Sequence, residues 1–164
     1  MCGDTQRPTF GGTIAMVSPI ENKISSNTSE SSLSSSPDSV TSSASSMSSY
    51  SLFFRDAETA SQKTKAIFRI DDAETYNTLR ACRQVDMRIE QYGDLSTTKP
   101  TTRPLHEFRL DLGTQAPREF QRDVELELPE RLDLGVSEKG VVGRQVTMSE
   151  PDGTVLGVGI VGYN

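Results

Sequence analysis

The sequence contains no tryptophan, one histidine and only two cysteines in 164 residues. The lone His106 and the distant Cys2 and Cys82 are too few ligands for an ordinary structural zinc site, and no Asp/Asn pattern matches a calcium loop. We therefore expect no metal and no other cofactor. Nothing in the spacing indicates a disulfide, so we expect both thiols to be free in a reducing compartment.

Long apolar runs are also missing. The longest strongly apolar run is Val155–Val161, which is interrupted by glycines, whereas a membrane-spanning helix needs about 20 residues. The first residues contain no apolar stretch of the kind found in a secretory signal. These absences predict a soluble, intracellular protein, cytoplasmic or, if viral, virion-associated. Peripheral contact with a membrane is left open.

Motifs for catalysis or phosphate binding are scarce. Residues 157–162 match the G-x-G-x-x-G pattern, but two residues follow them, so no helix could present its N-terminus to a pyrophosphate. A Cys82–His106 dyad is conceivable, yet nothing in the spacing favours it over a small buried thiol and a histidine that begins a strand. We expect no catalytic residues and no enzyme, with an enzyme of unrecognised type as the third hypothesis.

Serine dominates one segment, with 16 serines in residues 25–51. Such a stretch buries too little apolar surface to offset the entropy of ordering its backbone. We therefore predict a disordered tail over residues 1–50 and a single β-rich domain over residues 51–164. A short strand at Thr13–Val17 is the alternative within the tail. Ser36 precedes a proline, and Ser29 and Ser39 lie near acids, so these three serines are candidate phosphorylation sites.

After the tract, strands alternate apolar and polar residues. Val85–Ile89, Phe108–Leu112 and Val124–Leu128 keep period two, and residues 66–70 are rich in β-branched and aromatic side chains. We expect residues 51–54 to be the first ordered element after the tract, either a strand or a hydrophobic anchor. If the second and third of the alternating strands pair, Arg109 would face Glu125 or Glu127. One helix is predicted from about Asp72 to Gln84, beginning with acids that suit its N-terminus.

A terminal hairpin is the clearest local signal. Val141–Met148 leads into a Pro151-Asp152-Gly153 turn, and Thr154–Val161 leads out of it. In the last strand Leu156, Val158 and Ile160 share one face. The glycines between them lie on the other, where a second backbone could approach closely. Together these elements predict a mainly β fold, an antiparallel sandwich-like domain or a small α+β domain with one helix.

Charge is unevenly spread. Residues 123–164 carry three basic and eight acidic groups, a net of −5 within a total of −6. This acidic end disfavours a general nucleic-acid surface. The basic residues concentrate in the middle of the chain, and Arg80, Arg83 and Arg88 are the candidate contacts for an anion or RNA.

The leading functional hypothesis is a non-enzymatic structural or interaction protein that assembles with itself or binds a protein partner and carries a phosphorylatable tail. This organisation is typical of small viral matrix, coat or accessory proteins, an analogy of architecture alone. The candidate protein contacts are Leu52, Phe53 and Phe54, together with the exposed edge of the terminal hairpin. The alternative is an anion- or RNA-binding protein that uses the three arginines.

Overall fold

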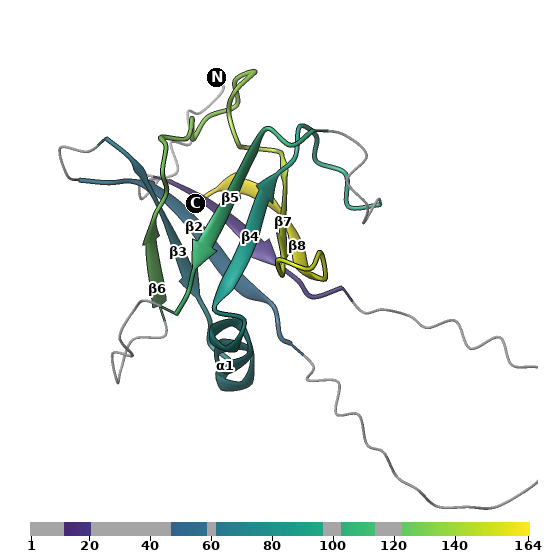
Figure 1. Ribbon diagram of the computed structural model, residues 1–164. Coiled ribbons are helices and arrows are strands. Elements are labelled where there is room, and N and C mark those ends of the chain that lie inside the picture. The colour runs from purple at the N-terminus through teal and green to yellow at the C-terminus, as the bar shows by residue number, and fades with distance from the viewer. Residues whose placement is uncertain (1–11, 21–46, 59–61, 97–102, 114–122) are drawn as a thin grey trace, which may run out of the picture.

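The computed structural model describes residues 12–20, 47–58, 62–96, 103–113 and 123–164 (Figure 1). These residues form an antiparallel sheet and one short helix, which confirms the predicted β-rich, one-helix fold class. The elements are β1 (Thr13–Val17), β2 (Tyr50–Asp56), β3 (Thr64–Arg69), α1 (Ala73–Ala81), β4 (Gln84–Ile89), β5 (His106–Asp111), β6 (Asp123–Glu127), β7 (Gln145–Ser149) and β8 (Val155–Tyr163). No helix in the described ranges is long and apolar enough to span a membrane.

The strands follow the order β5-β4-β7-β8-β1-β2-β3-β6, so β5 and β6 lie at the two ends of the sheet. The prediction that Arg109 faces Glu125 or Glu127 is therefore wrong. Arg109 instead makes two hydrogen bonds to Asp86 on β4, the shorter of them 2.8 Å. Strand β6 pairs with β3, so Lys65 lies opposite Glu127 and Ile67 opposite Glu125. The period-two patterns predicted where these strands lie in the sequence but not which strands pair with one another.

Strand β1 corrects the predicted domain boundary. It pairs with β2 on one side and with β8 on the other, so part of the expected tail is an interior strand of the sheet. Its inward residues Thr13, Ala15 and Val17 are almost fully buried. The short strand at Thr13–Val17 that was the alternative to disorder is thus present, although a pattern of five residues was too short to favour it. Residues 21–46, which include most of the serine tract, lie outside the described residues.

The helix is shorter than predicted. It begins where the Asp72 carboxylate accepts 2.7 Å hydrogen bonds from the Thr75 hydroxyl and from the Thr75 backbone N–H, and these bonds lower the pKa of Asp72. It ends at Ala81, because Arg83 adopts a left-handed conformation with φ of 55° that turns the chain into β4. The backbone N–H of Leu112 donates to the Arg83 carbonyl and fixes this turn against the end of β5.

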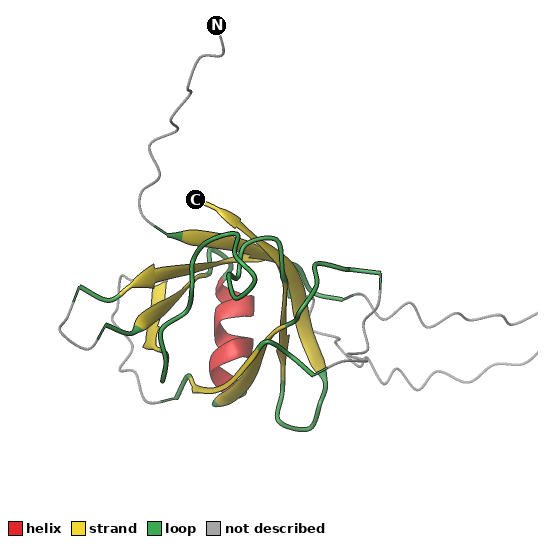
Figure 2. Ribbon diagram, turned by 90° about the horizontal axis from the view of Figure 1, so that it is seen from above, coloured by secondary structure: helices red, strands yellow, loops and turns green. Residues whose placement is uncertain are grey.

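The core lies inside the curve of the sheet. Figure 2 shows strands around α1, and Figure 1 shows that the helix closes one end of the sheet. Leu79 of the helix joins a core whose large, fully buried side chains include Phe54, Phe68 and Met148. We call the opposite end, where the β2–β3, β4–β5 and β6–β7 connections lie, the loop end.

The terminal hairpin is present, with its turn at the predicted residues. Gly153 has a φ of 93°, and Asp152 accepts a 2.8 Å hydrogen bond from the Thr154 backbone N–H. Both strands of the hairpin are interior strands, so it offers no free edge for docking. The close approach predicted at its glycines is found: a Cβ on Gly159 would lie 2.3 Å from the Met16 carbonyl oxygen.

Candidate functional site

The outer surface of the sheet divides into two halves. Side chains alternate between the core and the outside along each strand, so register shows which residues share the outer surface. On β4 and β5 the outward residues are charged: Asp86 and Arg88 on one strand, and Glu107, Arg109 and Asp111 on the other. This half has the polar character that a solvent-facing antiparallel sheet normally has.

The other half has an apolar centre, with Ser51, Arg55, Lys65 and Arg69 as polar outward residues around it. Strands β8, β1, β2 and β3 place six apolar side chains and one glycine on the outer surface, in positions that neighbour one another across the strands. We call this set the apolar face; it consists of Ile14, Met16, Phe53, Ile67, Val158, Ile160 and Gly162. Ile14 lies opposite both Phe53 and Gly162, and Phe53 lies opposite Ile67.

Two arginines flank the centre of this face. The guanidinium of Arg55 lies 5.8 Å from the Phe53 ring centroid and that of Arg69 lies 5.0 Å from it. Such cation–π contacts contribute about 0.5–1 kcal/mol at exposed sites. With these neighbours Phe53 retains 7% of its exposure, although it belongs to the outer surface and not to the core cluster. Met16, by contrast, protrudes with 55% of its surface exposed.

The border of the apolar face toward β6 is electrically balanced. Lys63 pairs with Glu127 at 3.2 Å, Lys65 with Glu125 at 3.9 Å, and Arg69 with Asp123 at 3.0 Å. These pairs are largely solvent-exposed, so each contributes at most about 1 kcal/mol to stability. Their effect on the surface is that three cations and three carboxylates cancel beside the face.

The predicted contact segment Leu52-Phe53-Phe54 is part of β2, and only its middle residue faces outward. Leu52 and Phe54 have no exposed surface and pack in the core. The structure therefore corrects this assignment: two of the three residues hold the domain together and cannot contact a partner while it is folded. A run of three apolar residues did not reveal which of them point inward.

The three arginines proposed for anion or RNA binding lie on different elements. Arg80 is in the last turn of α1 with its guanidinium 5.7 Å from the Tyr76 ring, and Arg83 is in the turn after the helix. Arg88 is five residues further on, on the outer surface of β4, where its Nε lies 3.5 Å from the Glu90 carboxylate. Burial raises the pKa of Glu90, and the charge of Arg88 opposes that shift.

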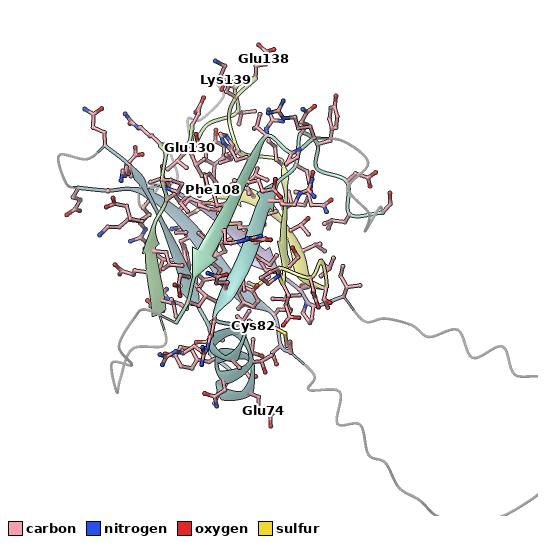
Figure 3. All side chains as sticks on the ribbon, in the orientation of Figure 1. Glu74, Cys82, Phe108, Glu130, Glu138 and Lys139 are labelled. Carbon is pink, nitrogen blue, oxygen red and sulfur yellow. The ribbon has the colours of Figure 1, made fainter. Side chains whose placement is uncertain are left out.

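Cys82 and His106 lie near opposite ends of β4 and β5. Since Ile89 pairs with His106 and Gln84 with Asp111, about 17 Å of strand separates the two ends. The Cys82 thiol donates to Glu150 at 3.1 Å, and burial with this contact raises its pKa to about 11. His106 Nδ1 instead lies 2.7 Å from Glu130, near the loop end (Figure 3). The two residues form no dyad.

No group of three His, Cys, Asp or Glu side chains in the described ranges could hold a metal ion. The candidate phosphorylation sites Ser29, Ser36 and Ser39 lie outside these ranges. Cys2 lies outside them as well.

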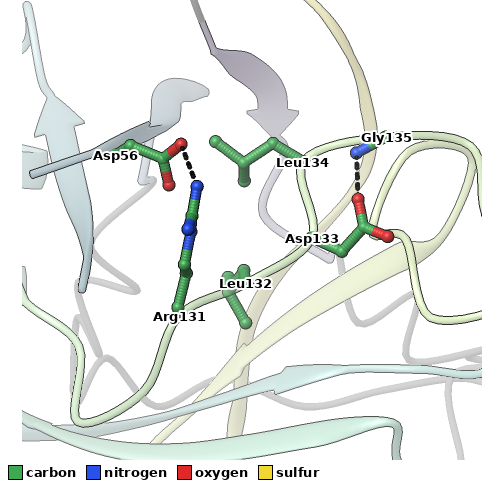
Figure 4. Close-up of a pocket in the computed structure, with 6 residues that line it drawn as sticks. All are labelled: Asp56, Arg131, Leu132, Asp133, Leu134 and Gly135. Carbon is green, nitrogen blue, oxygen red and sulfur yellow. Dashed lines mark hydrogen bonds and ion pairs between the residues drawn. The ribbon is translucent and has the colours of Figure 1, made fainter. Parts of the chain in front are cut away.

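A shallow pocket opens at the loop end, lined by Asp56 and residues 131–135 (Figure 4). Arg131 pairs with Asp56 at 3.2 Å. Asp133 accepts hydrogen bonds from the Gly135 backbone N–H, at 2.9 Å, and from the Ser137 hydroxyl, and these bonds lower its pKa. Both lining carboxylates are thus already engaged in shaping the loop, and we assign no ligand to this pocket.

No protein-family model matches this chain, and no curated protein matches it. Among solved structures, a mutant of Candida albicans superoxide dismutase 5 is similar to this chain with a TM-score of 0.42 and 11% sequence identity. The similarity covers 93% of this chain and 92% of that one. A likeness of this degree carries no argument about function.

Sequence reasoning missed the apolar face because its residues come from four strands far apart in the chain. A usable signal existed in the last strand, where Val158 and Ile160 alternate with glycines. The alternation was identified, but the sequence did not show which of the two sides faces the core. Close packing against β1 requires the glycines to face inward, which turns Val158 and Ile160 outward.

Proposed function

We propose that this protein is a non-enzymatic structural or interaction protein that associates with a protein partner, itself or another, through the apolar face. One observation supports this most: the outer surface is charged on β4 and β5, whereas on the other side a contiguous set of apolar side chains spans four adjacent strands. Isolated surface apolar residues need no explanation, whereas a contiguous set rimmed by polar residues is typical of an interaction site.

The energetics favour the same conclusion. Removing apolar surface from water contributes roughly 25 cal/mol per Å², so covering Met16 and its neighbours stabilises a complex. The paired strands beneath hold the backbone of the face in place, so little conformational entropy is lost on binding. The aromatic and arginine side chains at Phe53, Arg55 and Arg69 are types enriched where protein interfaces are strongest.

Charge supports a protein partner over a nucleic acid. The cations nearest the face, apart from Arg55, are paired with β6 carboxylates, and the whole chain carries −6. A surface for nucleic acid would need unpaired Lys and Arg side chains facing the phosphates.

A photo-crosslinking experiment tests this function whatever the partner is. A photo-reactive benzophenone residue replaces Ile67 on the apolar face and, as the matched control, Glu107 on the charged half. Both proteins are irradiated after purification and again in an extract of the cells that naturally make the protein. We expect crosslinked protein from position 67 and little from position 107 in at least one setting. Equal crosslinking from the two positions in both settings would contradict the proposal.

The serine-rich segment adds a regulatory component to the proposal. Each phosphate at Ser29, Ser36 or Ser39 would add about −1.5 to −2 charges near neutral pH. The chain already carries −6, so phosphorylation would strengthen repulsion between copies. Mass spectrometry of the protein from its natural source tests this directly, and unmodified serines throughout the segment would remove it from the account.

A further inference from the structure

We infer that a second copy of this chain covers the apolar face, with Met16 of each copy seated over Gly162 of the other. This rests on the proposed function and names its partner. Two features lie side by side on the apolar face: a projecting side chain, Met16, and a position without a side chain, Gly162, which we call the projection and the hollow.

Met16 is the projection. It is the most exposed member of the apolar face, and its side chain is unbranched and flexible enough to fit an irregular recess. Within the described residues its polar contact is weak: the Ser51 hydroxyl lies 4.0 Å from its sulfur. Little holds this side chain against its own sheet, so it is available to a partner.

Gly162 is the hollow. It lies on the same outer surface opposite Ile14, and a Cβ built on it would meet nothing closer than the Ile14 carbonyl oxygen at 3.8 Å. Gly157 and Gly159 of the same strand differ, because a Cβ on either would collide with β1. Packing within the domain therefore explains those two glycines and does not explain Gly162. At Gly162 the apolar surface lacks a side chain beside Ile14 and Ile160, which leaves room for a side chain from a partner.

The positions of these two residues suit a two-fold symmetric contact. Since Ile14 pairs with Gly162, Met16 lies diagonally across from Gly162 on the adjacent strand, a separation of about 7–8 Å. A two-fold axis between them, along the Ile14–Ile160 diagonal, exchanges the two positions. Each Met16 then meets the partner copy's Gly162, as a self-complementary interface requires.

Charge permits two copies to meet here despite the net charge of −6. The six apolar side chains of the face carry no charge, and the bordering charges beside β6 cancel in pairs, with Arg55 beside Phe53 as one additional cation. Like charges facing each other across an interface would cost several kcal/mol. The charged half of the surface, on β4 and β5, lies away from this contact.

The available surface suits a small contact. Four strands at about 4.8 Å spacing, with side chains overhanging, give an apolar area of about 20 by 20 Å, or roughly 400 Å². The loop at Tyr92 and Leu95 borders it, since a Cβ on Gly93 would lie 3.5 Å from Ile160 Cδ1. Both side chains are exposed. This loop and the flanking arginines extend the contact, which stays below the roughly 800 Å² that each partner buries in a standard interface and suits a reversible dimer.

Analytical ultracentrifugation of four proteins tests the pairing. Met16→Ala removes the projection and Gly162→Met fills the hollow. We expect each single variant to raise the dissociation constant at least about ten-fold, a loss of roughly 1.4 kcal/mol. The double variant Met16→Ala/Gly162→Met exchanges projection and hollow within one chain, so it should associate again. An equimolar mixture of the two single variants should likewise form mixed dimers.

Matched controls separate this contact from general effects. Val136→Ala trims an exposed apolar residue of a loop, and Glu107→Met adds a methionine to the charged half; both should leave association unchanged. Circular dichroism checks that each variant is folded. Wild-type protein that stays monomeric at all concentrations would overturn the inference, as would single variants that weaken association without recovery in the double variant. Crosslinks from Ile67 to other proteins alongside a monomeric wild type would leave the proposed function standing and remove only this partner.

Discussion

The guanidinium of Arg69 lies over the ring of Phe53, 5.0 Å from its centroid, while the same group makes two hydrogen bonds to Asp123. One side chain thus joins the apolar face to the charged border formed by β6. The bidentate contact fixes the guanidinium plane, and the fixed plane shields one side of the aromatic ring.

Arg69→Ala should destabilise the domain by about 1 kcal/mol, because it removes a cation–π contact and an exposed ion pair together. Urea unfolding measures this. Asp123→Ala removes the ion pair and leaves the guanidinium over the ring, so its effect should be smaller. Equal effects of the two substitutions would show that the contact with Phe53 contributes nothing.

Removing residues 1–49 should abolish folding. This deletion takes away β1, which pairs with both β2 and β8 and supplies Ala15 and Val17 to the core. We expect the shortened chain to show no cooperative thermal transition. A chain that begins at Gly12 keeps every described element and serves as the control. A cooperative transition in the shorter chain would contradict the position of β1 in the sheet.

Two glycines of β8 should respond oppositely to alanine. At Gly159 the new methyl group would lie 2.3 Å from a backbone oxygen of β1, so the strands must separate. We expect Gly159→Ala to cost about 3 kcal/mol or more, at the upper end of overpacking effects. At Gly162 the new methyl group would make only an ordinary 3.8 Å contact with the Ile14 carbonyl oxygen, so Gly162→Ala should be neutral or slightly stabilising. Thermal unfolding of the two alanine variants measures this difference in stability. Equal stability of both variants would count against the inward orientation of Gly159.

Stability should fall in alkaline solution. Burial and the contact with Glu150 raise the pKa of Cys82 from 9.0 to about 11, so the folded state holds this proton more tightly than the unfolded state. This contribution is fully present below pH 9 and is lost as pH rises through 11. Burial raises the pKa of Tyr50 in the same direction. Denaturant midpoints measured across this range should fall less for Cys82→Ser, and an identical fall would exclude the thiol as a cause.

Tyr50→Phe should be neutral or stabilising by up to about 1 kcal/mol. The Tyr50 hydroxyl is buried with no hydrogen-bond partner among the described residues, and removing such a group removes its desolvation cost. The ring contact with Phe68, 6.3 Å between centroids, remains in the variant. Urea unfolding at neutral pH measures the change, and a loss above about 1 kcal/mol would indicate that the hydroxyl has a partner.

Local patterns predicted the elements well. The period-two alternation of Val85–Ile89 and the residues of the Pro-Asp-Gly turn correspond to β4 and to the β7–β8 turn. Asp72 begins the helix as its side-chain chemistry indicated. Each of these signals lies within about ten residues of chain, where propensity and side-chain hydrogen bonds act directly.

Long-range pairing could not be predicted in the same way. By charge alone, Arg109 could pair with Glu125 as well as with Asp86. Which carboxylate it pairs with depends on which strands are neighbours in the sheet. Ile14, Phe53 and Ile67 meet because β1, β2 and β3 pair in one register, a fact that no single segment contains. The apolar face therefore emerged only from the assembled sheet.

The most direct test of the account is the mass of the full chain in solution, measured by light scattering over a concentration series for wild type and Ile67→Lys. Ile67 faces outward opposite Glu125, so a lysine there gains a carboxylate neighbour and should leave the fold intact while placing a charge in the contact. We predict that the wild-type mass rises toward twice 18.0 kDa and that the variant stays at 18.0 kDa. A wild-type monomer at every concentration, or a variant that dimerises as the wild type does, would contradict the assignment of the apolar face as the surface where two copies meet.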